Sequence, residues 1–121
     1  MSELSETPSS EGYQQALSLL HNCCTPDGFL ASITDSTNYR RIWARDGVIL
    51  SLAALMTHDP ELVHGVRATL TTLAKYQGPH GEIPSNVDTL LERVSYGGTS
   101  GRVDSNLWFI IGCAEYYKAT A

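Results

Sequence analysis

Two segments of the chain are apolar on almost every side of a helix, and they constrain the fold more than any other feature. One spans about residues 45–57, where the apolar run 48–56 is interrupted only by Ser51. The other spans about residues 104–119 and contains the apolar run 107–111. A helix that is hydrophobic all round is a buried helix. Both segments are therefore predicted to be inner helices with neighbours on every side.

The segments before these two helices each have one apolar face, which is typical of outer helices at a protein surface. The first is predicted at about residues 11–23, capped by Ser9 or Ser10. The second begins at Asp59-Pro60-Glu61, which supplies a cap, a proline in the first turn and an acid near the positive helix end, and it ends at Gly78. Residues 1–10 are polar and predicted to be a disordered tail, and residues 11–121 to form one folded region.

The order of these elements predicts an all-α fold of antiparallel helical hairpins, as in a toroid of inner and outer helices. No strand pattern competes with it, and residues 25–44 and 79–103 are predicted to be long loops, the second with a helical turn near residues 89–93. Both loops lead from an outer to an inner helix, so both lie at one end of the hairpins. Long loops inside compact domains are more often functional than not. Asp46 and Asp104 begin the inner helices at that end, which is the candidate site.

Composition excludes several classes of function. The net charge of -5 argues against nucleic-acid binding. No stretch of the sequence is apolar enough for a membrane span, and residues 1–10 lack the features of a signal peptide. The three cysteines are predicted to be free, buried or partly buried thiols, which suits a reducing cytoplasm. Cys23, Cys24 and His21 supply too few ligands for a metal site.

Five polar or aromatic positions are candidates for binding at the loop end. Trp43 offers a flat face for a sugar ring, Arg45 fixed donors and Asp46 charged acceptors. The alternative is structural, with Asp46 as a helix cap, Arg45 as its ion-pair partner and Trp43 as core. Asp104 either caps the last helix or points into the site, and Glu82 is either a contact at the rim of the site or a solvated acid on a structural turn.

Three motifs, in order, resemble the six-hairpin glycoside hydrolases, which include glycogen-debranching amylo-α-1,6-glucosidases, glucoamylases and alkaline/neutral invertases. The motifs are Tyr-x-x-Ile-Trp-Ala-Arg-Asp-Gly-Val-Ile, Gly-Glu-Ile-Pro-x-Asn-Val and Gly-Arg-Val-Asp-Ser-x-Leu-Trp-Phe. The resemblance covers about residues 11–121 and implies about two hairpins of an (α/α)6 toroid. It implies sugar binding at the cleavage subsite by Trp43, Arg45 and Asp46, a cavity-lining role for Asp104 and Trp108, and no cofactor.

The resemblance places the general acid on a later hairpin and the base nearer the C-terminus, and neither has a matching position before Ala121. The chain is therefore expected to be part of a glycoside hydrolase that binds α-glucosidic carbohydrate and is catalytically incomplete. Asp46 and Asp104 are a replacement pair only if they stand roughly 6.5–9.5 Å apart, and a carboxylate beside an arginine is a poor proton donor. The alternative is a small helical carbohydrate-binding or assembly module. In either case the apolar inner helices are predicted to be exposed or to self-associate.

Overall fold

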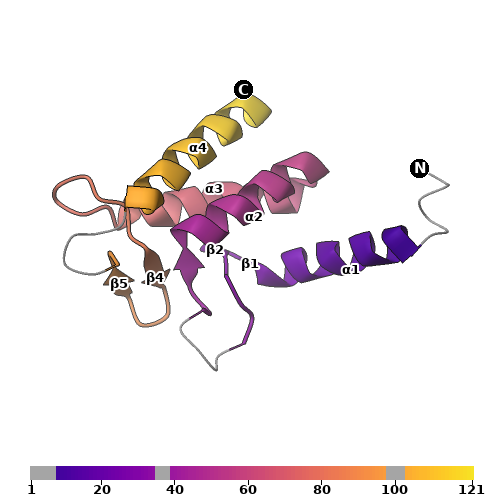
Figure 1. Ribbon diagram of the computed structural model, residues 1–121, viewed down its shortest axis with the longest axis horizontal. Helices are drawn as coiled ribbons and strands as arrows, with labels where there is room; N and C mark the ends of the chain where they lie inside the picture. The colour runs from indigo at the N-terminus through magenta and orange to yellow at the C-terminus, as the bar shows by residue number, and fades with distance from the viewer. Residues whose placement is uncertain (1–7, 35–38, 98–102) are drawn as a thin grey trace.

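The computed structural model describes residues 8–34, 39–97 and 103–121. These residues form four helices: α1 (Pro8–Cys23), α2 (Ala44–Thr57), α3 (Pro60–Lys75) and α4 (Val103–Thr120). Helix α2 packs against both α3 and α4, while α1 extends away from the other three helices (Figure 1). The order of two amphipathic and two apolar helices follows the prediction from the sequence.

The prediction of an all-α fold, as two hairpins of an (α/α)6 toroid, is wrong. Among the described residues, five short strands lie in the two predicted loops or at their edges: β1 (Cys24–Thr25), β2 (Gly28–Phe29), β3 (Ile42–Trp43), β4 (Asn86–Asp88) and β5 (Arg93–Ser95). Strands β1 and β2 form an antiparallel pair, and β3, β4 and β5 form an antiparallel sheet in that order. The fold is mixed α and β. Strands of two or three residues are too short to show the alternation by which strands are predicted.

Helix boundaries differ from the predicted ones by a few residues. Residues 8–10 are helical rather than part of a disordered tail, and residues 1–7 of that predicted tail lie outside the described chain. The segment predicted to be a helical turn near residues 89–93 is the turn of the β4–β5 hairpin and the start of β5. The cap of α3 is confirmed, since the Asp59 carboxylate accepts from the backbone N–H of Glu61 at 2.9 Å.

Helix α3 ends at Lys75, before Gly78. The reason is that Gly78 closes a separate turn, where its N–H donates to the Glu82 carbonyl at 2.8 Å.

The hydrophobic core lies between α2, α3, α4 and the β1–β2 pair. Val48 of α2, Leu62 and Val66 of α3, and Phe29 of β2 are completely buried in one cluster. Leu20 joins α1 to this cluster. Ile42 of β3 and Val87 of β4 are buried on the core side of the three-stranded sheet. The core therefore holds the start of α2 and the sheet in a fixed relation, which positions the loop end of the molecule.

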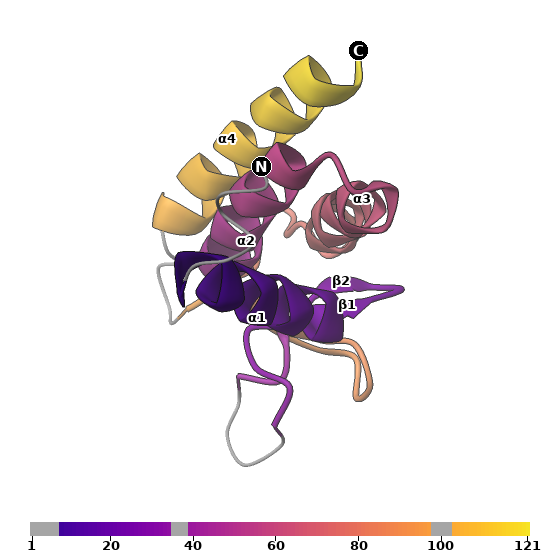
Figure 2. The same ribbon diagram turned by 90° about the vertical axis from the view of Figure 1, so that its right-hand side faces the viewer.

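Helix α4 is only half covered, although its sequence is apolar on nearly every side. Its inner side carries buried Ser105 and Gly112, with Trp108 and Phe109 packed against the core. Val103, Leu107, Ile110 and Tyr117 are exposed on its outer side, and α4 lies at the outer edge of the helices (Figure 2). The predicted burial on all sides is wrong for α4, and the predicted exposure of apolar surface on this helix is confirmed.

Gly28 is the position where the β1–β2 turn meets α3 most tightly. Its φ is 123°, and a Cβ added there would lie 2.6 Å from the Thr69 Cα. Beside it, the Thr69 hydroxyl accepts from the Phe29 N–H at 2.9 Å and donates to the Gly65 carbonyl at 2.9 Å. A side chain at residue 28 would therefore separate this turn from α3.

We predict that Gly28→Ala lowers the free energy of unfolding by about 2–3 kcal/mol, because it adds backbone strain to a clash with backbone atoms. Urea denaturation followed by circular dichroism measures the change. Gly12→Ala is the matched control, since nothing lies within 4 Å of the added methyl group and the site is in α1. Equal effects of the two substitutions would contradict the packing described here.

Candidate functional site

The first two sequence motifs are joined by a β-ladder at the start of α2. Ile42 pairs with Val87 and Trp43 pairs with Asn86 between β3 and β4. The ladder continues into the helix, where the Ala44 N–H donates to the Ser85 carbonyl at 3.0 Å. In Figure 1, β3 leads directly into α2 beside β4. Residues more than forty positions apart are thus held at one fixed register.

The third motif is tied to the other two at the start of α4. The Asn106 Oδ1 accepts from the backbone N–H of Ile83 at 2.8 Å, which links α4 to the second motif. The Arg45 Nε lies 3.2 Å from the Asp104 Oδ2, which links α4 to the first motif. The prediction that the beginnings of the two apolar helices lie together is confirmed by this ion pair.

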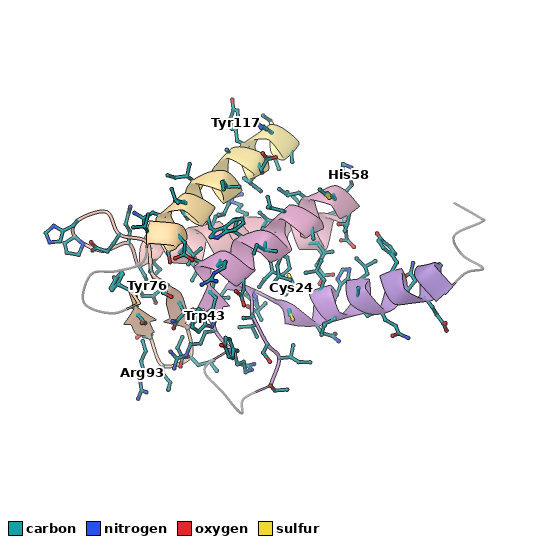
Figure 3. All side chains as sticks on the ribbon, viewed as in Figure 1. Cys24, Trp43, His58, Tyr76, Arg93 and Tyr117 are labelled. Carbon is teal, nitrogen blue, oxygen red and sulfur yellow. The ribbon has the colours of Figure 1, made fainter. Side chains whose placement is uncertain are left out.

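Trp43 lies at the boundary between the sheet and α2. Its backbone is extended, with φ -100° and ψ 138°, and it occupies the N-cap position of α2. Its ring is partly exposed and stacks on the ring of Tyr39, with centroids 5.4 Å apart and planes inclined by 30°. Figure 3 labels Trp43 below the start of α2 and Arg93 below β5. The alternative interpretation of Trp43 as core is therefore wrong.

The two faces of the three-stranded sheet differ sharply in chemistry. Alternate side chains point to opposite faces of a strand, so buried Ile42 and Val87 belong to the core face. The other face carries Trp43 with polar partners from the neighbouring strands, namely Asn86, Asp88, Arg93 and Ser95. An aromatic ring among amide, carboxylate and guanidinium groups can bind a ligand that has both CH faces and hydroxyls.

Asp46 and Arg45 do not form the cap and ion pair of the structural alternative. Trp43 is the N-cap residue and its side chain makes no capping bond, while Asp46 lies in the first turn. A carboxylate there is stabilised by the positive end of the helix. Arg45 pairs with Asp104, and their side chains are 52% and 40% exposed. An ion pair this exposed contributes about 0.2–1 kcal/mol to the free energy of unfolding. Its main effect is therefore to orient the two side chains.

Two predicted site residues have structural positions. Glu82 closes its own turn, because its carbonyl accepts from Gly78 and its carboxylate accepts weakly from the His80 N–H at 3.4 Å. A Cβ on Gly78 would overlap the Glu82 carboxylate. Trp108 is partly buried and packs against the core of α2 and α3. The structural interpretation of Glu82 fits its contacts better than a role at the rim of the site.

Arg41 is a site residue that sequence reasoning missed. Its Nη1 donates to the Asn86 Oδ1 at 3.0 Å, and its Nε lies 4.0 Å from the Asp88 Oδ2. Arg41 precedes β3 by one residue, so it shares the Trp43 side of the sheet. The arginine fixes the amide of buried Asn86 and balances the charge of Asp88. The sequence places Arg41 inside the first motif, but only the β3–β4 register shows what it contacts.

The structure also bears on the classes of function set aside from composition. Within the described ranges, no group of three or more His, Cys, Asp or Glu side chains could hold a metal ion. Among the same residues, no helix has the length and hydropathy needed to cross a membrane. Comparison with protein-family models, curated proteins and solved structures finds no match to this chain.

The three cysteines are free thiols, as predicted, with Cys23 buried and Cys24 and Cys113 partly buried. Burial raises the pKa of each thiol. The pKa of Cys24 is raised further by the negative charges of Glu61 and Asp59, after the larger effect of burial. A raised pKa keeps a thiol protonated and unreactive at neutral pH.

We predict that removing the Asn106 side-chain acceptor lowers the free energy of unfolding by about 1–3 kcal/mol, because the Ile83 N–H loses its partner. Asn106→Ala tests this in urea denaturation. Asn106→Asp keeps an acceptor oxygen at the same position and should retain most of the stability. If the two variants are equally destabilised, the hydrogen bond is not what holds the second and third motifs together.

We predict that alkylation of Cys24 by iodoacetamide is slow at pH 7 and rises about tenfold per pH unit up to and beyond pH 9, because only the thiolate reacts. In urea-unfolded protein the rate should level off at a lower pH, since the unfolded thiol has its ordinary pKa. Mass spectrometry of the modified peptide measures both rates. A folded-state rate that levels off between pH 7 and 8 would contradict the raised pKa.

Proposed function

We propose that this chain binds a glucose unit of an α-glucosidic carbohydrate at the loop end of α2 and α4, as the sugar-binding part of a glycoside hydrolase. The observation that carries the proposal is the convergence of the three motifs. The β3–β4 ladder, the Asn106–Ile83 hydrogen bond and the Arg45–Asp104 ion pair each join two of them. The three motifs thus meet in one place, where a single ligand would be able to contact all of them.

The aromatic part of this site is suited to a pyranose ring. A sugar presents an apolar face of C–H groups between equatorial hydroxyls, and an exposed indole covers that face while shedding water. Tyr39 is half exposed and stacks on Trp43, so one face of the indole packs against Tyr39 and a sugar ring would use the opposite face. Because Trp43 sits at a strand-to-helix junction, its backbone is fixed by the ladder and by the first turn of α2.

The polar part of this site supplies directed hydrogen bonds to hydroxyls. The guanidinium of Arg45 has five N–H donors in a rigid plane, and its Nε lies 3.2 Å from the Asp104 Oδ2. The Asp104 carboxylate has a second oxygen, and the Asp46 carboxylate lies one residue beyond Arg45 in the same turn. Adjacent donors and acceptors match a pair of neighbouring sugar hydroxyls, each of which both donates and accepts.

The proposal assigns binding to these carboxylates and assigns proton transfer to neither of them. Cleavage of a glycosidic bond needs one carboxyl group that donates a proton and another that activates water or attacks. Asp104 is held against a guanidinium, with the Arg45 Nε 3.2 Å from its Oδ2. The role that suits Asp104 is that of a hydrogen-bond acceptor for the substrate.

The apolar grooves between the helices are less suitable for a sugar. One groove of about 360 Å³ between α1 and α2 is lined almost wholly by carbon, including Tyr13, Leu17 and Leu50. It offers a sugar few partners for its hydroxyls, which would lose their hydrogen bonds to water on entry. The polar face beside Trp43 does not impose that cost.

We place the protein in a reducing compartment, the cytoplasm. Three free thiols whose pKa values are raised by burial are inert in such an environment, and no disulfide constrains the described fold.

We predict that maltose or isomaltose shifts the indole N–H resonance of Trp43 in a two-dimensional NMR titration, with a dissociation constant of about 1 mM. Trp108 is the internal control, because it packs against the core and its resonance should stay in place. Trp43→Ala should abolish binding, and Asp104→Asn should weaken it by about tenfold or more, since a charged acceptor is lost. Glu11→Gln, an exposed change on α1, should have no effect.

Two results would overturn this assignment. A shift at Trp108 with none at Trp43 would move the ligand to the helix core. Release of glucose by the purified chain, lost in Asp104→Asn, would make Asp104 a group that transfers a proton rather than one that binds.

A further inference from the structure

The outer face of α4 carries a continuous apolar stripe. Its members alternate in spacing between four and three residues along the helix, which is the spacing of the seam in a two-stranded coiled coil. The exposed fractions are 76% for Val103, 54% for Leu107, 64% for Ile110 and 71% for Tyr117, and Ala114 between them is also exposed. Such a stripe is costly to leave in water.

The stripe faces away from both helices that touch α4. On one side, Ile111 and Lys118 line a groove of about 540 Å³ together with Leu55 and Met56 of α2. On the other side, Phe109, Cys113 and Tyr116 line a groove of about 440 Å³ against α3, and Tyr117 of the stripe also lines this groove. The stripe therefore lies between two grooves, on a helix that lies at the outer edge of the molecule (Figure 2).

An ion pair lies at each end of the stripe, on the edge next to α2. Near its start, Asp104 pairs with Arg45 at 3.2 Å. Near its end, Lys118 pairs with Glu115 at 3.2 Å. Asp104 and Lys118 are two heptads apart, so they flank the seam at equivalent positions. The centre between them is Ile111.

We propose that α4 pairs with α4 of a second copy of this chain, antiparallel, about a two-fold axis near Ile111. In this arrangement Asp104 of each copy meets Lys118 of the other, and the seam residues of one stripe pack between those of the other. In a parallel pair this flank would instead face the other flank of the partner helix, where α4 carries the uncharged residues Asn106, Cys113 and Thr120. The charges beside the stripe therefore favour the antiparallel direction.

The surroundings of the seam fit this partner. The Oδ2 of Asp104 faces Arg45, so Oδ1 is the oxygen that would face Lys118 of the second copy. The groove beside Met56, which is 80% exposed, lies next to the end of one stripe and receives apolar side chains from the start of the other. A seam of one helix is small for an interface, so the dimer forms at high protein concentration and dissociates on dilution. The proposal does not depend on sugar binding.

Sedimentation equilibrium tests the association. The wild-type mass should rise with concentration from 13.2 kDa toward twice that value. Ile110→Glu places a charge in the middle of the seam and should keep the chain monomeric at every concentration. Leu90→Glu is the matched control, because Leu90 is 73% exposed but lies in the β4–β5 turn away from α4. It should associate like the wild type.

Carbodiimide cross-linking tests the direction of the pair. The expected product is a dimer whose digest contains an amide between Asp104 and Lys118. Within one chain these residues lie roughly 21 Å apart along the helix at 1.5 Å per residue, so the product must join two copies. Lys118→Gln should abolish it. A monomeric wild type, a dimer that survives Ile110→Glu, or a dimer cross-linked without the Asp104–Lys118 peptide would each overturn the proposal.

Discussion

The β3–β4 ladder is the contact on which the loop end of this protein depends. Its two residue pairs divide their side chains between the two faces of the sheet, with Ile42 and Val87 on the core face, and partly exposed Trp43 and buried Asn86 on the opposite face. A register shift of one residue would exchange these faces, placing an indole in the core and exposing two aliphatic side chains. Burial of Ile42 and Val87 therefore also fixes where Trp43 points, so that core packing and the candidate site are set by the same few hydrogen bonds.

Much of the helical layout could be predicted from the sequence because helices carry their own local signals. Asp59 and Pro60 indicate the start of α3, and the apolar runs predict α2 and α4. The strands could not be predicted, since residues 42–43 and 86–88 are too few to show a period and pair only because the helices bring them together. The apolar sequence of α4 likewise predicts that Leu107 and Ile110 pack against another surface, but it does not indicate which surface that is.

The candidate site was predictable in its location and less so in its contacts. That Asp46 and Asp104 begin two helices at one end follows from the order of the elements. That Arg45 reaches Asp104, while Arg41 reaches Asn86, depends on how far α4 lies from α2 and on the strand register. Glu82 shows the converse, because its motif suggests a ligand contact and its geometry shows a closed turn. The motif to which a residue belongs predicts where the residue lies, but only its contacts show what the residue does there.

Asp104 belongs both to the proposed sugar site and to the proposed seam, so the two proposals are linked. Its carboxylate has two oxygens, one facing Arg45 and one that both a sugar hydroxyl and Lys118 of a second copy would use. Two ligands that compete for one atom lower each other's affinity by the same factor, because the coupling free energy is reciprocal. If both proposals hold, carbohydrate therefore favours the monomer and association weakens carbohydrate binding. A ligand at the apolar groove beside α1 would carry no such coupling, since that groove does not include Asp104.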